Sequence, residues 1–133
     1  MKTVFADSFY FFALLNDRDP AHPSALQFLQ SYRGRLLTTD WVLTELADGM
    51  ANPVNRGSFL TTLNLLKSEP SVTIVECSAA LQTAGIELYR ARPDKHWSLT
   101  DCISFVVMQG EGISEALTGD KHFEQAGFVA LLK

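Results

Sequence analysis

The sequence predicts an α/β fold with a central parallel sheet of about five strands, and three observations lead to this prediction. Short β-branched or aliphatic runs alternate with longer stretches of helical period, which is the pattern of βαβ units. The 133 residues suit one domain, so we expect a single domain over residues 1–133. Hydrophobic residues make up 47% of the chain and aromatic residues 11%, which excludes intrinsic disorder because this much apolar surface can form a core.

Five short apolar runs are predicted to be strands. Each run is too short for a typical helix and is bounded by polar or turn-forming residues. The predicted strands are residues 3–6, 36–38, 72–75, 116–117 and 128–132.

The segments between these runs have the spacing of helices. Pro23 suits the first turn of a helix, Thr39 or Asp40 can cap another, and the Asn52-Pro53 pair breaks the chain before the next. The predicted helices are residues 8–15, 23–33, 40–50, about 59–66, 78–89, 100–109 and a helical turn at 121–125.

The charge of the chain restricts the classes of partner. Eleven basic and 15 acidic residues give a formal net charge of −4. Such a chain lacks the diffuse positive field that drives non-specific nucleic-acid binding. A nucleic-acid function would therefore need a local basic patch or a bound cation.

Cysteine content and hydropathy restrict the location. Cys77 and Cys102 form no CxxC pair, so neither a disulfide framework nor a zinc site is indicated, and a cytoplasmic location is expected. The apolar stretch at residues 9–15 does not read as a signal peptide, because charged residues stand where small cleavage-site residues are needed. No apolar run reaches the roughly 18 residues of a membrane span, so no membrane association is expected.

Four acidic residues lie among apolar neighbours. Asp7 follows the first predicted strand, at the edge where open α/β sheets bind ligands. Asp120 follows the fourth strand, Glu45 lies on a largely apolar helix, and Asp101 opens another helix. Because a carboxylate on an apolar face is costly to desolvate, these four acids are candidates for a shared site.

Each acid also has a structural alternative. Asp7 and Asp101 precede or open helices and are equally well explained as helix caps, worth on the order of 1 kcal/mol each. Asp120 beside Gly119 suits a turn. Glu45 is harder to explain structurally, because no Lys or Arg lies within one helical turn of it in the sequence.

Taken together, the four acids indicate a metal site. Several carboxylates in one crevice cannot all stay ionised without a cation. Mg²⁺ prefers oxygen ligands and commonly binds phosphate substrates, and Mn²⁺ is its usual substitute. The chemistry that this predicts is metal-assisted phosphoryl displacement.

Four segments carry a resemblance to a known family: VFADS at residues 4–8, TTDWVLTE at 38–45, WSLTD at 97–101 and LTGDKHFEQAGF at 117–128. With these motifs the chain resembles PIN-domain ribonucleases over its whole length, and more closely the VapC-type toxins of VapBC toxin–antitoxin pairs. The resemblance implies a three-layer α/β/α sandwich around the parallel sheet. It also implies an endoribonuclease that cuts RNA phosphodiester bonds with a water activated by Mg²⁺ or Mn²⁺.

By this resemblance, the four acids hold the metal and perform catalysis: Asp7, Glu45, Asp101 and Asp120. Ser8 and Thr118 match positions that support the metal site, although an ordinary cap or turn role is equally open for each. The resemblance further implies a VapB-type antitoxin as partner and a homodimer. It gives no role to residues 52–70, where such proteins vary.

A basic and aromatic cluster precedes Asp101 and consists of Arg90, Arg92, Lys95, His96 and Trp97. Arg and Lys can hold RNA phosphates while Trp97 offers a stacking face for an unpaired base. The alternative is a solvated loop with Trp97 packed in the core.

Lys121 and His122 beside Asp120 are equally open between an RNA-facing and a solvated role. The three histidines show no HExxH-like spacing, which argues against a histidine-bound zinc.

Competing interpretations fit less well. A haloacid-dehalogenase-like phosphatase needs a second acid two residues after the first, where Phe9 stands, and a response-regulator receiver needs an acidic pair near the first strand. A PIN-like module that binds RNA or protein without cutting it remains the alternative, although the full set of acids argues against it.

Overall fold

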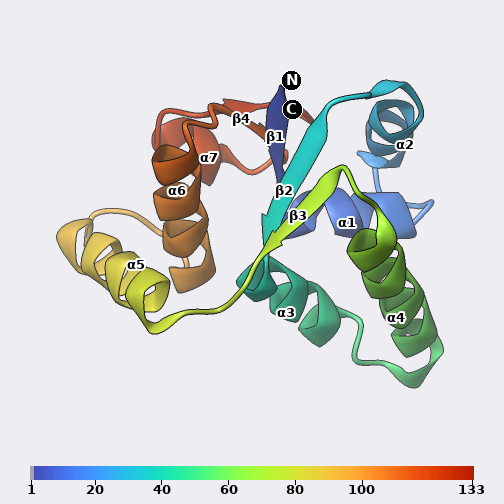
Figure 1. Ribbon diagram of the computed structural model, residues 1–133, viewed down its shortest axis with the longest axis horizontal. Helices are drawn as coiled ribbons and strands as arrows, with labels where there is room; N and C mark the ends of the chain where they lie inside the picture. The colour runs from blue at the N-terminus through green and yellow to red at the C-terminus, as the bar shows by residue number, and fades with distance from the viewer. Residues whose placement is uncertain (1) are drawn as a thin grey trace.

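The computed structural model describes residues 2–133, in which five strands and seven helices alternate (Figure 1). The strands are β1 (Thr3–Ala6), β2 (Arg35–Thr39), β3 (Val72–Val75), β4 (Glu115–Leu117) and β5 (Val129–Ala130). The helices are α1 (Ser8–Leu15), α2 (His22–Ser31), α3 (Asp40–Gly49), α4 (Pro53–Ser68), α5 (Ala79–Ala91), α6 (Leu99–Glu111) and α7 (Lys121–Gln125).

The strands form one parallel sheet in the order β3-β2-β1-β4-β5. β1 is central and pairs with β2 on one side and with β4 on the other. Val4, Phe5 and Ala6 of β1 are fully buried, which fits a parallel strand covered on both faces. The predicted parallel sheet of about five strands is therefore confirmed.

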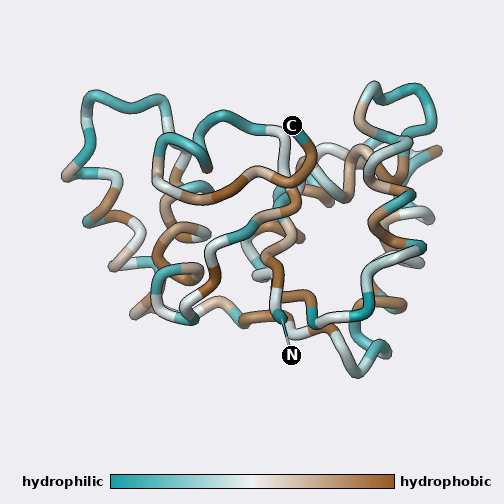
Figure 2. The backbone as a smooth tube through the Cα atoms, turned by 90° about the horizontal axis from the view of Figure 1, so that it is seen from above, coloured by the Kyte–Doolittle hydropathy of each residue, from teal (hydrophilic) through white to brown (hydrophobic). Residues whose placement is uncertain are grey.

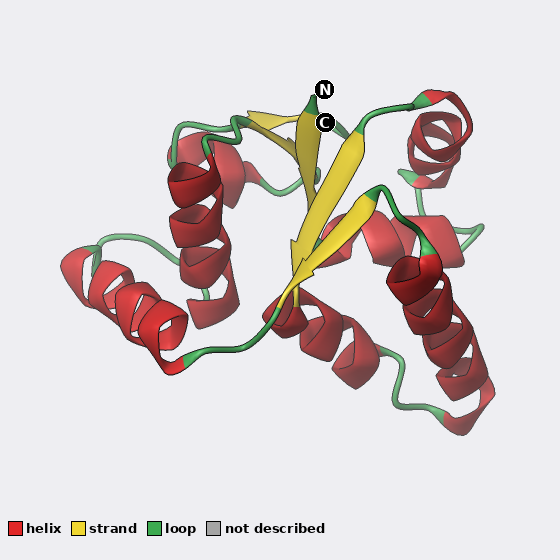
Figure 3. Cartoon of the chain, viewed as in Figure 1, coloured by secondary structure: helices red, strands yellow, loops and turns green. Residues whose placement is uncertain are grey.

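Helices cover the sheet on both sides (Figures 1 and 3). In these views α5, α6 and α7 lie to the left of the sheet and α1, α2 and α4 to the right, while α3 lies below and contacts both α1 and α6. Figure 2 shows that the outer loops are mostly hydrophilic. The arrangement is the expected α/β/α sandwich, and none of the described helices is long and apolar enough to cross a membrane.

The packing of the helices is uneven. α6 contributes seven buried residues, whereas none of the described residues of α4 is buried. Phe105 of α6 makes edge-to-face contacts with Trp97 and Phe123, at centroid distances of 5.0 and 4.9 Å. This aromatic cluster packs α6 against α7. Asp101 lies on α6 and Asp120 caps α7, so the cluster helps to position both acids.

The predicted elements differ from the structure mainly at their ends. α6 begins at Leu99 rather than Thr100, because Ser98 is its N-cap, and it runs to Glu111. Gly112 ends it in the left-handed conformation with φ 68°, which a residue without a Cβ adopts at no steric cost. The last strand is shorter than predicted, at Val129–Ala130, and α4 already begins at Pro53.

Candidate metal centre

The four predicted acids lie together at the carboxyl edge of the sheet. They line one cavity of about 360 Å³ with residues from α1, α3, α6, α7 and the segments before α6 and α7. The lining residues are Asp7, Ser8, Phe9, Phe12, Glu45, His96, Ser98, Asp101, Asp120 and His122. The structure thus brings together all four acids and Ser8, while their metal-binding role stays a prediction.

Asp7 stands at the N-cap position of α1, yet its side chain makes no capping hydrogen bond. Its carboxylate is 5% exposed and accepts a hydrogen bond of 2.9 Å from the Thr118 hydroxyl. Burial raises the pKa of Asp7 from 3.8 to about 7, against the Thr118 bond and with a further contribution from the charge of Asp101. The helix-cap alternative therefore does not account for Asp7, whose charged form needs a cation nearby.

Asp101 has a different local role from the one expected. Ser98, not Asp101, is the N-cap of α6, and the two residues form a capping box in which each side chain accepts from the other's backbone N–H. Burial raises the pKa of the Asp101 carboxyl, against its hydrogen bonds with Ser98 and His122. The capping box fixes the carboxylate at the cavity, so a structural role and a site role coexist in this residue.

Thr118 connects two of the acids. Its buried hydroxyl donates to Asp7 Oδ2 and accepts from the Asp120 backbone N–H at 3.0 Å. Asp120 in turn caps α7, because its Oδ1 accepts from the His122 backbone N–H at 2.9 Å. Thr118 therefore ties the turn after β4 to the end of β1.

Glu45 enters the cavity from α3 and is half-buried. Ser8, which is 7% exposed, donates its hydroxyl hydrogen bond to Glu45 Oε1. The carboxylate is thus held by a neutral donor instead of a Lys or Arg, which leaves its negative charge uncompensated. Ser8 and Thr118 thus lie beside the acids, and their support of a metal site stays a prediction.

His122, whose role the sequence left open between RNA-facing and solvated, lies in the site. Its Nδ1 lies 3.0 Å from Asp101 Oδ2 and 3.4 Å from Asp120 Oδ1. Ligand atoms of Asp101, Asp120 and His122 all lie within 4.8 Å of one another, a spacing that could hold a metal ion. The signal in the sequence was that His122 follows Asp120 by two residues. Asp120 caps α7, and the first turn of this helix brings the ring of His122 back toward Asp120.

The donor set fits a hard divalent cation. Two of its four carboxylates are almost fully buried, and none of the described residues lining the cavity is a Lys or Arg. Mg²⁺ and Mn²⁺ both favour carboxylate oxygen, and Mn²⁺ also accepts an imidazole nitrogen. A cation at this place would offset the mutual repulsion of the acids.

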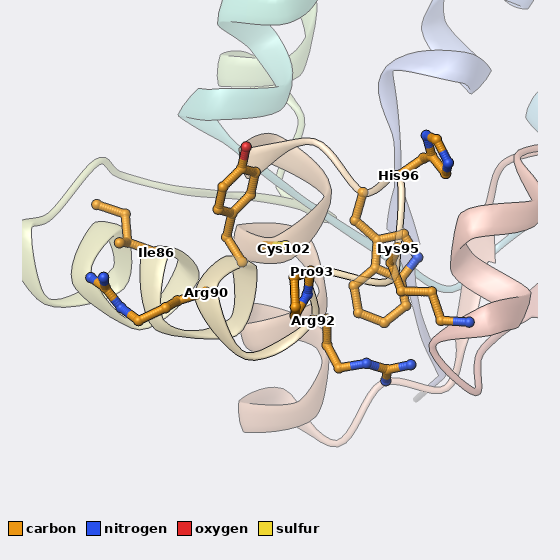
Figure 4. Close-up of a pocket in the computed structure, with 9 residues that line it drawn as sticks. Ile86, Arg90, Arg92, Pro93, Lys95, His96 and Cys102 are labelled. Atoms are coloured by element: carbon orange, nitrogen blue, oxygen red, sulfur yellow. The ribbon is translucent and has the colours of Figure 1, made fainter.

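The basic cluster forms a second cavity of about 690 Å³ beside the first (Figure 4). Trp97 is 6% exposed, donates from Nε1 to Gln125 Oε1 at 3.0 Å and packs on Phe105. The Arg92 guanidinium lies 5.1 Å from the centre of its ring. The expectation that Trp97 offers an open stacking face is therefore wrong, and the alternative of core packing holds, because Arg92 and the core cover the ring.

Comparison with known proteins gives the family and the fold of the chain. The family model described as PIN domain matches residues 4–129. The 23S rRNA-specific endonuclease VapC20 of Mycobacterium tuberculosis is 25% identical over 126 residues, which are 95% of each chain. Its crystal structure, described as that of a Sarcin-Ricin loop cleaving toxin, superposes with a TM-score of 0.86 at 25% identity over 95% of this chain and 96% of that one. VapBC2 from Rickettsia felis, bound to a promoter DNA fragment, matches at 15% identity with a TM-score of 0.67 over 96% of each chain. The chain belongs to the PIN-domain family.

Proposed function

We propose that this protein is a divalent-metal-dependent endoribonuclease that acts as the toxin of a type II toxin–antitoxin pair. One observation carries the proposal: four carboxylates from distant parts of the chain converge on one cavity with no Lys or Arg among its described lining residues. VapC20, the relative that matches along 95% of this chain, is by name a 23S rRNA-specific endonuclease. Structured ribosomal RNA is accordingly the first substrate to test.

The acids of the cavity and the hydroxyls that contact them have defined tasks in this proposal. Asp7, Glu45, Asp101 and Asp120 hold Mg²⁺, or Mn²⁺ in its place. A bound cation supplies a water of lowered pKa and stabilises charge on the scissile phosphate. Thr118 orients Asp7 and the turn that carries Asp120, and Ser8 orients Glu45. The hydrophobic neighbours Phe9 and Phe12 line the same cavity.

A protein partner and a location complete the proposal. A toxin of this kind needs a cognate antitoxin, and the R. felis neighbour is by its description a VapBC assembly, so we assign a VapB-type antitoxin to this chain. A homodimer and action in the cytoplasm belong to the same proposal. The free thiols Cys77 and Cys102 suit a reducing compartment.

The decisive experiment compares Asp101→Asn with a matched acid outside the cavity, Asp48→Asn. Asp48 is exposed on α3, one helical turn from Glu45. The wild type and Asp48→Asn should cleave structured RNA with Mg²⁺ or Mn²⁺ and stop with EDTA. Asp101→Asn should fold, because Asn can still accept from the Ser98 N–H, yet lose on the order of 10³-fold in rate, since a metal is worth several kcal/mol of charge stabilisation. Equal cleavage by Asp101→Asn would overturn the mechanism.

Thermal unfolding tests the metal independently of activity. Mg²⁺ at 100 times its dissociation constant should stabilise the wild type by about 2.7 kcal/mol, because it binds the folded state alone. The shift should persist in Asp48→Asn and vanish in Asp7→Asn. Absence of a metal-dependent shift in the wild type, together with RNA binding but no cleavage, would instead establish the non-catalytic binding module.

A further inference from the structure

The second cavity adjoins the candidate metal centre. Its nine lining residues come from the end of α5, the following loop and α6. They are Ile86, Tyr89, Arg90, Arg92, Pro93, Lys95, His96, Trp97 and Cys102. His96 lines both cavities, so the two are contiguous on the surface.

The two cavities carry opposite charge. Four carboxylates line the metal centre, whereas the lining of the second cavity contains Arg90, Arg92 and Lys95 and no described acidic residue. In a chain of net charge −4, this is a local reversal of sign next to the predicted site of phosphate chemistry. A polyanion that enters the metal centre would place its neighbouring phosphates at the basic cavity.

The three cations are not equally free. Arg92 is held by Asp94 through two hydrogen bonds of 3.0 and 3.1 Å and also covers the ring of Trp97. Lys95 approaches Asp94 only to 4.0 Å. Arg90 lies 3.6 Å from Glu87, and both of these side chains are mostly exposed, so their pairing is weak. Arg92 is thus part of the wall, while Arg90 and Lys95 are available for phosphate oxygens.

The same cavity has an exposed aromatic ring. Tyr89 is 56% exposed, in contrast to the buried Trp97. An exposed ring beside two available cations is the combination that binds single-stranded nucleic acid, since bases stack on the ring while the cations contact the backbone. In Figure 4 Arg90 and Lys95 extend toward opposite ends of the cavity, and His96 points away from both. This arrangement suits a strand that passes across the cavity.

We propose that the basic cavity binds the single-stranded RNA that flanks the cleaved bond, with Arg90 and Lys95 on phosphates and Tyr89 stacked on an unpaired base. The proposal rests on the proposed function, because it assigns a second subsite to the same substrate. RNA is favoured over a protein segment because a basic cavity next to a metal centre suits consecutive phosphates of one strand.

The test measures binding of a fluorescent single-stranded RNA to the full chain in EDTA, so that no cleavage occurs. Arg90→Gln and Lys95→Gln should each weaken binding and lower the slope of log affinity against log salt by about 0.7. Tyr89→Leu should weaken binding on the order of tenfold with an unchanged salt slope. The matched control is Lys67→Gln, an exposed charge on α4, which lies on the other side of the sheet in Figure 1 and should bind as the wild type does.

The controls distinguish a loss of RNA binding from a loss of the fold, from binding of a protein partner and from failure of the proposed function. All four variants should keep the Mg²⁺-dependent rise in melting temperature, which shows that the fold and the metal centre are intact. Wild-type RNA binding by Arg90→Gln and Lys95→Gln, or equal weakening by Lys67→Gln, would overturn the proposal. So would variants that keep RNA affinity but lose inhibition by the antitoxin, since the cavity would then bind protein. Wild-type protein that binds RNA in this way but never cleaves it would overturn the proposed function alone.

Discussion

The two adjoining cavities are built in opposite ways. The acidic cavity combines residues from 7 to 122, from segments that meet only in the folded chain, and its carboxylates are held by Thr118, Ser98 and Ser8. The basic cavity comes from one continuous stretch, residues 86–102, and its available cations are mostly solvent-exposed or only loosely paired. The comparison teaches that chemistry needs buried, fixed groups, whereas attraction of a polyanion needs only exposed charge.

This difference predicts different responses to change. A buried carboxylate with a raised pKa depends on its exact neighbours, so a substitution there should have large effects that salt does not reverse. Exposed cations act through a screened field, so substitutions should have graded, salt-dependent effects.

After removal of an acid itself, the largest effect is expected where the acids of this cavity are held in place. Thr118→Val removes the hydroxyl that bonds both Asp7 and the Asp120 N–H. Cleavage should fall about 10- to 100-fold, as it does when the partners of metal ligands are removed. Stability should fall by about 1–3 kcal/mol, because buried polar groups lose their partners.

Thr38→Val is the matched control for this variant. Thr38 is also fully buried, and its hydroxyl donates to the Ala6 carbonyl of β1 at 2.9 Å. Chemical denaturation should show a similar loss of stability, while cleavage assays should show nearly wild-type rates. Equal loss of cleavage in both variants would mean that Thr118 acts only through the stability of the fold.

The next effect concerns pH and stability without metal. The folded state raises the pKa of Asp7 from 3.8 to about 7, so between these values it keeps a proton that the unfolded state has released. Raising the pH across this range must therefore favour unfolding. In EDTA the wild type should lose a few kcal/mol between pH 4 and pH 8, and the raised pKa of Asp101 acts in the same direction.

Denaturation curves of two variants check this expectation. Asp7→Asn should have a flatter profile and be the more stable protein at pH 8. Asp94→Asn should retain the wild-type slope of unfolding free energy against pH above pH 5. The reason is that, in the wild type, hydrogen bonds from Arg92 lower the pKa of the Asp94 carboxyl. An unchanged slope of unfolding free energy against pH in Asp7→Asn would contradict the conclusion that the Asp7 carboxylate is an uncompensated charge in the acidic cavity.

The smallest effect is expected in the basic cavity and has the opposite sign. Asp94 pairs with Arg92 and lies near Lys95, so its negative charge opposes the binding of a phosphate at Lys95. Asp94→Asn should strengthen RNA binding in EDTA about two- to threefold at low salt, and the gain should fade as salt increases. Weaker binding in this variant would show that Asp94 holds Arg92 in the conformation that RNA requires.

The sequence was a good guide to the elements and to the acids. The alternation of apolar runs and helical periods predicted a strand or helix at the place of each described element, because these signals are local, although it missed the first part of α4. The convergence of Asp7 and Asp120 was predictable because the carboxyl ends of neighbouring parallel strands meet at one edge of the sheet. Glu45 and Asp101 lie on helices, and their place beside the other two acids was expected from the resemblance to PIN-domain proteins.

The errors arose where distant contacts decide. Trp97 looked available for stacking, but Phe105 and Gln125 bury it, and Gln125 is 28 positions away. The capping alternative for Asp101 was correct in kind, because Asp101 forms a capping box with Ser98, although Ser98 is the N-cap residue. The closeness of His122 to Asp120 has a local signal, but its contact with Asp101, 21 positions away, depends on how α7 packs on α6.

The order of strands also determines when the site can exist. β1 is synthesised first, but its neighbour β4 comes near the end of the chain, and the bond from Thr118 to Asp7 spans 111 positions. A nascent chain that ends before Glu115 contains Asp7, Glu45 and Asp101 but lacks the strand, the hydroxyl and the fourth acid that complete the cavity. The cavity is therefore incomplete until β4 and the turn that carries Asp120 have been synthesised, long after Asp7 and Glu45 have left the ribosome.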